Sequence, residues 1–404
     1  MREKLELHCD VISGYAFSTS DWREEGIPVV KIGNISNGED ILCDEQTQYV
    51  DESFLAKLDE KYHISKGDLL ISLTGSHINQ PNSMVGRTCR SLTDRKYLLN
   101  QRAGKVLPFD NTNKNYLYYL LSTKAVKYDI ANRAYGGANQ VNVSPKDIKK
   151  LKWEFPDLEI QKKIAGVLST YDELIENNNQ RIAILAQMAE NLYKEWFIRR
   201  KNENWKLVKL SQFGYSLESG SRPKGGIDSF LQEGYPSLGA EAIGELGKFD
   251  FSTAKLIPED FYKKMKRGLG KDKDILLYKD GAYIGKVTLF MDDFPYKDYA
   301  VNEHVFLMRS NNPIYQYYLY FTLALPQYFT QMQNLNRNAA QPGLTGKDID
   351  IIKLYLPDEE IAKKFNTTIE PMLHKIFSLA KQNKNLKKQR DLLLPRLMSG
   401  KLEV

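Results

Sequence analysis

The residues Pro156-Asp157-Leu158-Glu159-Ile160-Gln161-Lys162-Lys163 return as Pro357-Asp358-Glu359-Glu360-Ile361-Ala362-Lys363-Lys364, an offset of 201 residues between positions 156 and 357. Just upstream, Ser144-Pro145-Lys146-Asp147-Ile148 matches Thr345-Gly346-Lys347-Asp348-Ile349 at the same offset. Looser similarities extend back through both halves of the chain. Two copies with a period near 200 residues indicate a duplicated domain rather than a solenoid.

A long amphipathic pattern follows each copy of the repeat and predicts a helix. Its apolar residues recur in alternating steps of four and three, which is typical of a coiled-coil seam, and consecutive steps of four around Asn178 resemble a stutter. Each tail of roughly 40 residues predicts a rod of about 60 Å at 1.5 Å per residue. The predicted seam residues are Ile164, Val167, Tyr171, Leu174, Asn178, Ile182, Leu185 and Leu192 in the first tail and Phe365, Met372, Leu379, Asn383, Leu386 and Leu393 in the second.

A lone helix with one apolar stripe needs a partner in water. Because the two tails carry matching stripes, we expect an antiparallel two-helix coiled coil within one chain, with Asn178 and Asn383 fixing its register. The alternative is that each helix packs separately on its own globular half.

Each globular half mixes short apolar runs and helical patterns, which predicts an α/β (α+β) fold. Strands are expected near residues 29–32, 68–72 and 105–107, and buried helices near 116–121 and 315–321. The predicted organisation is two globular domains separated by two long helices. The domains are residues 1–155 and 205–355, and the helices are residues 156–200 and 356–404.

The composition is that of an ordinary globular protein. The chain has 404 residues, 42% of them hydrophobic and 27% charged, and a net charge of +6. No apolar run approaches the roughly 18 residues of a membrane-spanning helix, and the start shows no signal peptide. Three cysteines without a CxxC pair favour a reducing cytoplasm. The 24 tyrosines on a mildly basic chain are compatible with a nucleic-acid partner.

Several catalytic patterns are present only as fragments. Asn312-Pro313-Ile314-Tyr315 resembles an amino-methyltransferase motif but lacks its second proline, and no glycine-rich methyl-donor loop precedes it. Gly281-Ala282-Tyr283-Ile284-Gly285-Lys286-Val287 is one residue too short for a P-loop. The five histidines show no metal-binding spacing. We therefore expect no catalytic residues and no metal site in this chain.

Two unlike domains, each followed by a repeated helical tail, resemble the specificity subunit of type I restriction-modification systems. The likeness covers nearly the whole chain. The stretches that carry it are Gly14-Tyr15-Ala16-Phe17, Ile27-Pro28-Val29-Val30-Lys31-Ile32-Gly33-Asn34-Ile35, Gly67-Asp68-Leu69-Leu70-Ile71-Ser72, Val85-Gly86-Arg87, Asn100-Gln101-Arg102, Val143-Ser144-Pro145-Lys146-Asp147-Ile148, Leu192-Tyr193-Lys194-Glu195-Trp196-Phe197 and Leu393-Leu394-Pro395-Arg396-Leu397-Met398-Ser399-Gly400. In the second domain Ser237-Leu238-Gly239-Ala240 replaces Val29-Val30-Lys31-Ile32, so its first strand is less well marked.

The resemblance implies a DNA-binding subunit that does no chemistry. Each globular domain would be a target-recognition domain that reads one part of a split, asymmetric target on double-stranded DNA, with half-sites about 34 Å apart. The helices would separate the domains and dock two modification (methyltransferase) subunits. No cofactor is expected in this chain; S-adenosylmethionine would lie on the modification subunits, and ATP with Mg²⁺ on restriction subunits that join the complex.

Polar residues of the predicted loops are the candidate readers of DNA bases. They are Ser76, His77, Asn79, Gln80, Arg87, Arg133, Tyr135, Asn139 and Gln140 in the first half and Ser221, Arg222, Lys224, Tyr283, Lys286, His304, Arg337, Asn338 and Gln341 in the second. Two alternatives remain open: a coiled-coil scaffold that does not read DNA, and a self-sufficient DNA adenine methyltransferase built around Asn312 to Tyr315.

Overall fold

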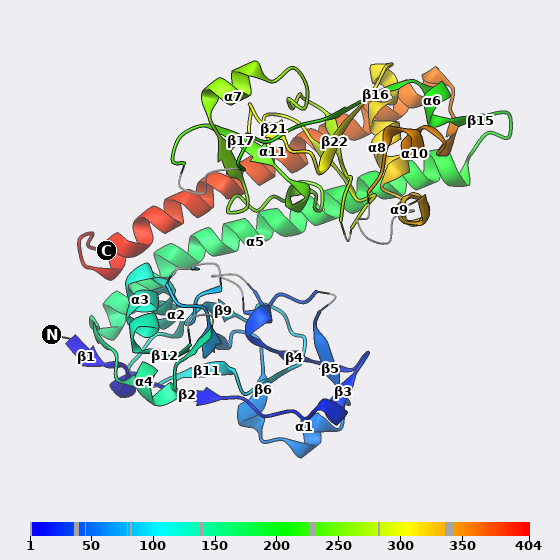
Figure 1. The fold of residues 1–404 in the computed structure, drawn as a ribbon. Helices are drawn as coiled ribbons and strands as arrows, with labels where there is room; N and C mark the ends of the chain where they lie inside the picture. Colours follow the sequence, from blue (N-terminus) through cyan, green and yellow to red (C-terminus); the bar gives the residue numbers. More distant parts are fainter. Residues whose placement is uncertain are drawn as a thin grey trace. The chain divides into compact units, whose positions relative to one another are not determined.

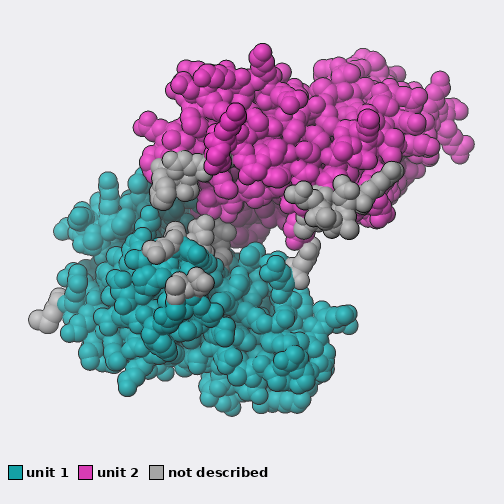
Figure 2. Space-filling model, viewed as in Figure 1, with its two compact units in different colours: residues 1–173, 387–404 teal, residues 174–386 magenta. Residues whose placement is uncertain are grey.

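The chain forms two compact units (Figure 2). The computed structural model describes residues 2–35, 40–44, 46–78, 80, 83–137, 140–226, 231–281, 283–335 and 343–404. Unit 1 comprises residues 1–173 and 387–404, and unit 2 comprises residues 174–386. The two globular domains expected from the sequence lie in different units, and each long helix, α5 (Leu158–Lys194) and α11 (Glu359–Met398), contributes to both units (Figure 1).

Unit 1 is a mixed α/β structure built on short strands. Its strands are β1 (Arg2–Lys4), β2 (Cys9–Ser13), β3 (Trp22–Arg23), β4 (Ile27–Val30), β5 (Gln48–Val50), β6 (His63–Ile64), β7 (Leu69–Ser72), β8 (Thr74–Gly75), β9 (Thr88–Arg90), β10 (Tyr97–Leu99), β11 (Ala103–Pro108), β12 (Tyr135–Gly137), β13 (Gln140–Asn142) and β14 (Lys152–Glu154). Its helices besides the long ones are α1 (Phe54–Lys57), α2 (Lys114–Ser122), α3 (Lys124–Arg133) and α4 (Pro145–Lys149).

The sheets of unit 1 pack around separate clusters of buried apolar residues. An antiparallel sheet in the order β2-β11-β7-β9 packs against α2, all of whose residues from Tyr116 to Leu121 are buried. A second sheet has the order β3-β5-β4-β10-β6, in which β4 and β10 are parallel. Residues Ile164, Ala165 and Leu168 of α5 and Leu397 of α11 belong to the same core cluster as α2.

Unit 2 repeats this architecture. Its elements are β15 (Lys206–Lys209), α6 (Leu210–Phe213), β16 (Tyr215–Ser219), β17 (Tyr235–Leu238), β18 (Lys255–Ile257), α7 (Glu259–Lys264), β19 (Asp274–Tyr278), β20 (Val287–Phe290), β21 (Ala300–Val301), β22 (Val305–Ser310), α8 (Gln316–Leu323), α9 (Pro326–Leu335), α10 (Gly346–Asp350) and β23 (Lys353–Leu356). The sheet β16-β22-β19-β20 matches β2-β11-β7-β9, and the order β18-β17-β21 matches β5-β4-β10, including the parallel pair. The first strand of the second domain, less well marked in the sequence, is therefore present as β17.

The matching stretches Ser144–Ile148 and Thr345–Ile349 of the internal repeat encode a helix start. Ser144 caps α4 by accepting a hydrogen bond at Oγ from the Asp147 backbone N at 3.1 Å, and Thr345 caps α10 through Asp348 in the same way. Serine and threonine at this position satisfy a free backbone N–H of the first helical turn. The recurrence of Ser/Thr-x-x-Asp thus follows from helix capping.

Within each unit, α5 and α11 run antiparallel, as the sequence predicted. In unit 2 the Asn178 side chain donates to Asn383 Oδ1 at 2.9 Å, while Tyr193, further along α5, packs on Phe365, further back along α11. In unit 1 Asp172 accepts a hydrogen bond from Arg390 at 2.7 Å. The alternative of two separately packed helices is therefore wrong.

The buried face of α5 differs from the predicted seam at two positions. Val167 is 38% and Leu174 is 48% exposed, whereas the next residues, Leu168 and Ile175, are buried. An α-helix of 3.6 residues per turn drifts relative to a strict 3.5-residue repeat, and α5 also packs on the globular domains. The other predicted seam residues are at least half-buried: Ile164, Tyr171, Asn178, Ile182, Leu185 and Leu192 on α5, and Phe365, Met372, Leu379, Asn383, Leu386 and Leu393 on α11.

The ends of the long helices follow their sequence signals. Helix α5 passes into one turn of π-helix over Glu195–Arg199, and Trp205 then anchors unit 2 by donating from Nε1 to Asp358 at 3.0 Å. Helix α11 is followed by Gly400 at φ +66°, a left-handed conformation that glycine adopts without strain. Among the helices that the structure describes, none is long and apolar enough to cross a membrane.

Candidate nucleic-acid interface

Two of the predicted reader segments of unit 1 lie on one small sheet. Strand β8 pairs with β13, and β13 pairs with β12, so the loop after β8 starts beside these two paired strands. Thr74 Oγ1 donates to Asn142 Oδ1 at 2.7 Å across this sheet. A side chain at Gly136 (φ +145°) would meet the Gln140 carbonyl, which explains the glycine. The fold thus gathers residues that are about 60 positions apart in the sequence.

Two predicted readers of unit 1 support the loops instead of facing solvent. Ser76 is 6% exposed, and its Oγ donates to the Gln80 carbonyl at 2.7 Å. Arg87 is half-buried and donates from Nη2 to the Ile32 carbonyl at 2.8 Å, and burial lowers the pKa of its guanidinium. The partner of Arg87 is 55 positions away, so the sequence could not show its role, whereas the partner of Ser76 lies four residues away in the same loop.

The remaining predicted readers of unit 1 are accessible or lie outside the described residues. Gln80, Arg133, Tyr135 and Gln140 are exposed, with Tyr135 at 60%, and His77 is half-buried. Asn79 and Asn139 lie outside the described residues.

Unit 2 gathers two predicted readers, Arg222 and His304, into one polar cluster built from three loops. Arg222, which follows β16, pairs with Glu303 and lies 3.4 Å from His304 Nε2. His304 Nδ1 lies 3.3 Å from Asp280 Oδ2, and Lys279 donates from Nζ to the Glu303 carbonyl at 3.1 Å. The side chains of Arg222, Glu303 and His304 are each between 33% and 46% exposed. The cluster therefore presents both hydrogen-bond donors and hydrogen-bond acceptors to solvent.

The other predicted readers of unit 2 flank this cluster or cannot be placed. Lys286 lies over the Tyr283 ring at 3.9 Å, and both side chains are exposed. Ser221 and Lys224 are exposed beside Arg222. Arg337, Asn338 and Gln341 lie outside the described residues.

Three accessible polar residues at equivalent turns of the two units, two in unit 1 and one in unit 2, were not among the predicted readers. Gln101 and Arg102 stand between β10 and β11, and Glu303 stands between β21 and β22. A signal was present, because the turn sequences Asn100-Gln101-Arg102 and Asn302-Glu303-His304 occur at matching places in the two halves. We call residues 100–102 corner 1 and residues 302–304 corner 2.

The two fragments of catalytic motifs serve the fold. Asn312 caps the turn that leads into α8 by accepting from the Ile314 backbone N at 3.2 Å, and the Tyr315 hydroxyl is buried and donates to the Pro357 carbonyl at 3.0 Å. Gly285 and Lys286 form the turn before β20. Among the described residues, no group of three or more His, Cys, Asp or Glu side chains could hold a metal ion.

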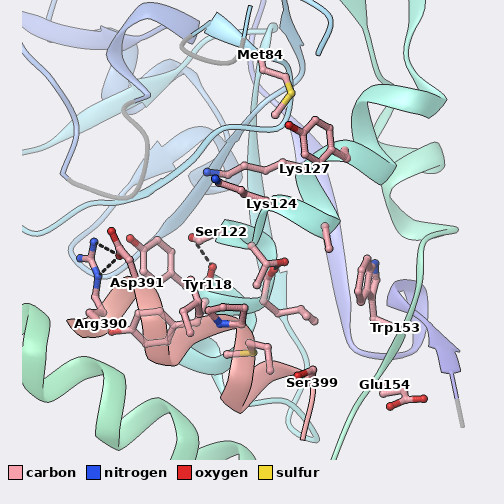
Figure 3. Close-up of a pocket in the computed structure, with 18 of the residues that line it drawn as sticks. Met84, Tyr118, Ser122, Lys124, Lys127, Trp153, Glu154, Arg390, Asp391 and Ser399 are labelled. Carbon is pink, nitrogen blue, oxygen red and sulfur yellow. Dashed lines mark hydrogen bonds and ion pairs between the residues drawn. The ribbon is translucent and has the colours of Figure 1, made fainter. Parts of the chain in front are cut away.

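Unit 1 also contains a cavity of about 1070 Å³ at the C-terminal end of α11 (Figure 3). Lys124 and Lys127 of α3 line it together with Arg390 and Asp391 of α11, which are paired at 2.8 Å. Burial lowers the pKa of the Lys127 ammonium to about 8, with a smaller contribution from the nearby charge of Arg87. The cavity is lined mainly by α2, α3 and α11, so it does not contain the corner residues.

The equivalent place in unit 2 is filled by aromatic rings. At an offset of 201 residues, Leu394 and Met398 of the cavity wall correspond to Tyr193 and Phe197. Tyr193 stacks on Phe321 at 5.7 Å, and Phe197 packs within an aromatic core. The smaller side chains of α11 therefore account for part of the space in unit 1.

Comparison with known proteins gives consistent results for sequence and fold. The family described as "Type I restriction modification DNA specificity domain" matches this chain twice, over residues 6–187 and 202–388. The type I restriction enzyme MjaIX specificity subunit of Methanocaldococcus jannaschii is 29% identical over 324 residues, covering 76% of this chain and 73% of that protein. The putative MjaX specificity subunit of the same organism is 26% identical over 404 residues, covering 94% and 88%.

A solved structure supports the fold. The crystal structure of the type I restriction-modification S subunit from M. genitalium superposes with a TM-score of 0.56 at 17% identity, covering 98% of this chain and 95% of that one. At this identity the likeness shows the fold alone.

Proposed function

Because the chain belongs to the type I restriction-modification DNA specificity family, we propose that its two domains read the two parts of one split, asymmetric DNA target. The chain is a DNA-specificity subunit and not a catalytic subunit of such a system. The comparisons favour neither the scaffold nor the self-sufficient methyltransferase.

The observation that carries the split target is the pair of unlike polar surfaces on one repeated frame. The four-stranded sheets have matching strand orders and β18-β17-β21 matches β5-β4-β10, yet corner 1 presents glutamine and arginine where corner 2 presents glutamate and histidine. Side chains of different hydrogen-bonding character select different bases in the major groove. Two domains that differ here should therefore read different half-sites, which makes the target asymmetric.

Linking two readers in one chain raises their joint affinity. Once one domain is bound, the other meets DNA at an effective concentration set by the connection. Two weakly binding domains therefore bind the whole target tightly. The net charge of +6 supports phosphate contacts that position each domain without reading sequence.

We assign the chemistry to partner subunits. The chain assembles with methyltransferase and restriction subunits; in our proposal two modification subunits carry S-adenosylmethionine, restriction subunits carry ATP and Mg²⁺, and the chain itself binds neither cofactor. The paired helices α5 and α11 are the proposed docking surface.

The test is to co-express the chain with its cognate modification subunit and map N6-methyladenine across the host genome. One bipartite motif with two unlike halves is expected. Replacing residues 1–155 by the first domain of another family member should change one half only. Methylation at no discrete motif would refute the proposal, and DNA binding that is unselective and independent of salt would favour the scaffold alternative, because phosphate contacts weaken as salt rises.

A further inference from the structure

The backbone of corner 1 is fixed by hydrogen bonds that do not involve its exposed side chains. The Asn100 backbone N donates to the Val30 carbonyl at 3.1 Å, and Asn100 Oδ1 accepts from the Arg102 backbone N at 3.3 Å. The Arg102 carbonyl in turn accepts from the Leu73 backbone N at 2.9 Å. These bonds tie the turn to β4 and to the end of β7.

Corner 2 has the same bonds at the equivalent atoms. The Asn302 backbone N donates to the Leu238 carbonyl at 2.9 Å, and Asn302 Oδ1 accepts from the His304 backbone N at 2.9 Å. The His304 carbonyl accepts from the Lys279 backbone N at 3.0 Å. The asparagine thus holds the backbone of the turn in both units, and the two residues after it differ between the units.

We propose that these two residues are specificity-determining: Gln101 and Arg102 for the first half-site, and Glu303 and His304, with Arg222, for the second. This inference rests on the proposed function and names the residues that carry it out. Where two domains share a backbone frame but read different DNA, the difference in reading must come from side chains that the frame presents. The corners meet that condition in both units.

In corner 2 the contacts orient an arginine. Glu303 pairs with the Arg222 guanidinium, and His304 lies against the same nitrogen, Nη2. Asp280 holds the other side of the His304 ring at 3.3 Å. A guanidinium held at one edge has less freedom to lose on binding, and arginine reads guanine through two hydrogen bonds to O6 and N7. Arg222 is therefore the guanine reader, and Glu303 and His304 are its positioning residues.

The Glu303 carboxylate also has an acceptor to spare. Its Oε1 atom takes the Arg222 contact, whereas Oε2 is buried and accepts no hydrogen bond from the described residues. A carboxylate accepts from the amino group of cytosine. If DNA binding exposes this oxygen, Glu303 would both position Arg222 and read the cytosine of the same G·C pair.

In corner 1 the chemistry is different. Gln101 and Arg102 are both exposed. Glutamine pairs with adenine through N6 and N7, and arginine pairs with guanine. The first half-site should therefore contain adjacent A·T and G·C pairs under this corner.

The experiment uses the complex of this chain with its modification subunit and reads the N6-methyladenine motif. The double variant Glu303→Gln/His304→Arg gives corner 2 the residues of corner 1. It should change one or two neighbouring bases in the half of the motif assigned to the second domain by domain exchange, and leave the other half intact. The reciprocal variant Gln101→Glu/Arg102→His should change only the other half.

Single variants separate positioning from reading. Arg222→Ala should reduce discrimination at one G·C pair by about ten- to a hundred-fold, and Glu303→Gln should relax the same position less. As a control, Lys248→Ala removes an exposed lysine paired with Glu245 and should leave the motif unchanged. If thermal unfolding shows that the double variant does not assemble, the motif of the Arg222→Ala variant tests the assignment of corner 2.

The outcomes distinguish this inference from the proposed function. A wild-type complex without any discrete motif would overturn the proposed function. A wild-type bipartite motif that persists, with unchanged base preferences, in the corner variants or in Arg222→Ala would overturn only the assignment of the corners.

Discussion

Replacing Asp172 by asparagine should loosen the C-terminal part of α11 from unit 1. The Asp172 carboxylate is 15% exposed and accepts three hydrogen bonds: from Arg390 at 2.7 Å, from Arg90 at 2.6 Å and from the Tyr119 hydroxyl at 2.6 Å. Removing one charge from a buried ion pair costs about 3–5 kcal/mol, because the partner charge stays buried without its counter-charge. Since Arg390 keeps its pairing with Asp391, we expect the lower end, about 3 kcal/mol.

Hydrogen exchange is the suitable assay because a chain with two units need not unfold in one step. A loss of about 3 kcal/mol in local stability corresponds to amide exchange about a hundredfold faster, and we expect it in residues 387–398. Glu173→Gln is the matched control, since Glu173 is the neighbouring acidic residue and is exposed. Exchange in residues 387–398 that changes less than threefold in Asp172→Asn would refute the idea that this carboxylate holds α11.

Three further variants, one single and two double, test the packing of the two units. Burial lowers the pKa of Lys127 from 10.5 to about 8, so between these pH values the folded chain binds fewer protons than the unfolded chain. Lys127→Met should therefore raise the free energy of unfolding by about 1–3 kcal/mol below pH 8, and this gain should fade as the pH rises toward 10.5. Replacing both Asn178 and Asn383 by leucine should raise the melting temperature of the chain while weakening register, visible as added heterogeneity in the exchange of residues 174–194. Leu394→Tyr with Met398→Phe, which copies unit 2, should partly fill the cavity and slow exchange at the end of α11; faster exchange would mean that the space is too narrow for the rings.

The fold was predictable because its main signals are local or repeated. The capping pattern Ser/Thr-x-x-Asp, the buried run Leu69–Ser72 and the apolar stripes all act through neighbours in sequence. The prediction that Val167 and Leu174 are seam residues was wrong, because burial there depends on which face of α5 meets the globular domain. That face is set by side chains far away in the chain, which no local periodicity reports.

The site was harder to predict, and for a related reason. Polar character and loop position single out Ser76 and Arg222 equally, yet the first is buried in its own loop and the second is half-exposed in a charged cluster. The difference arises from Gln80 in one case and from Glu303, 81 positions away (222 to 303), in the other. Exposure of a polar side chain depends on the tertiary structure. Residues predicted from sequence to read DNA therefore include some whose side chains only support a loop.

The separation of frame from reader has an energetic consequence. The turn at each corner is held by backbone groups and by one asparagine. In corner 1 the two side chains that follow are exposed, so they carry little of the folding free energy. Substitutions at exposed positions away from caps and buried networks change stability by less than about 0.5 kcal/mol. The first domain can therefore exchange Gln101 and Arg102, and with them its DNA preference, with little loss of stability. Corner 2 is the more constrained, because a change at Glu303 also releases Arg222 and alters two contacts at once.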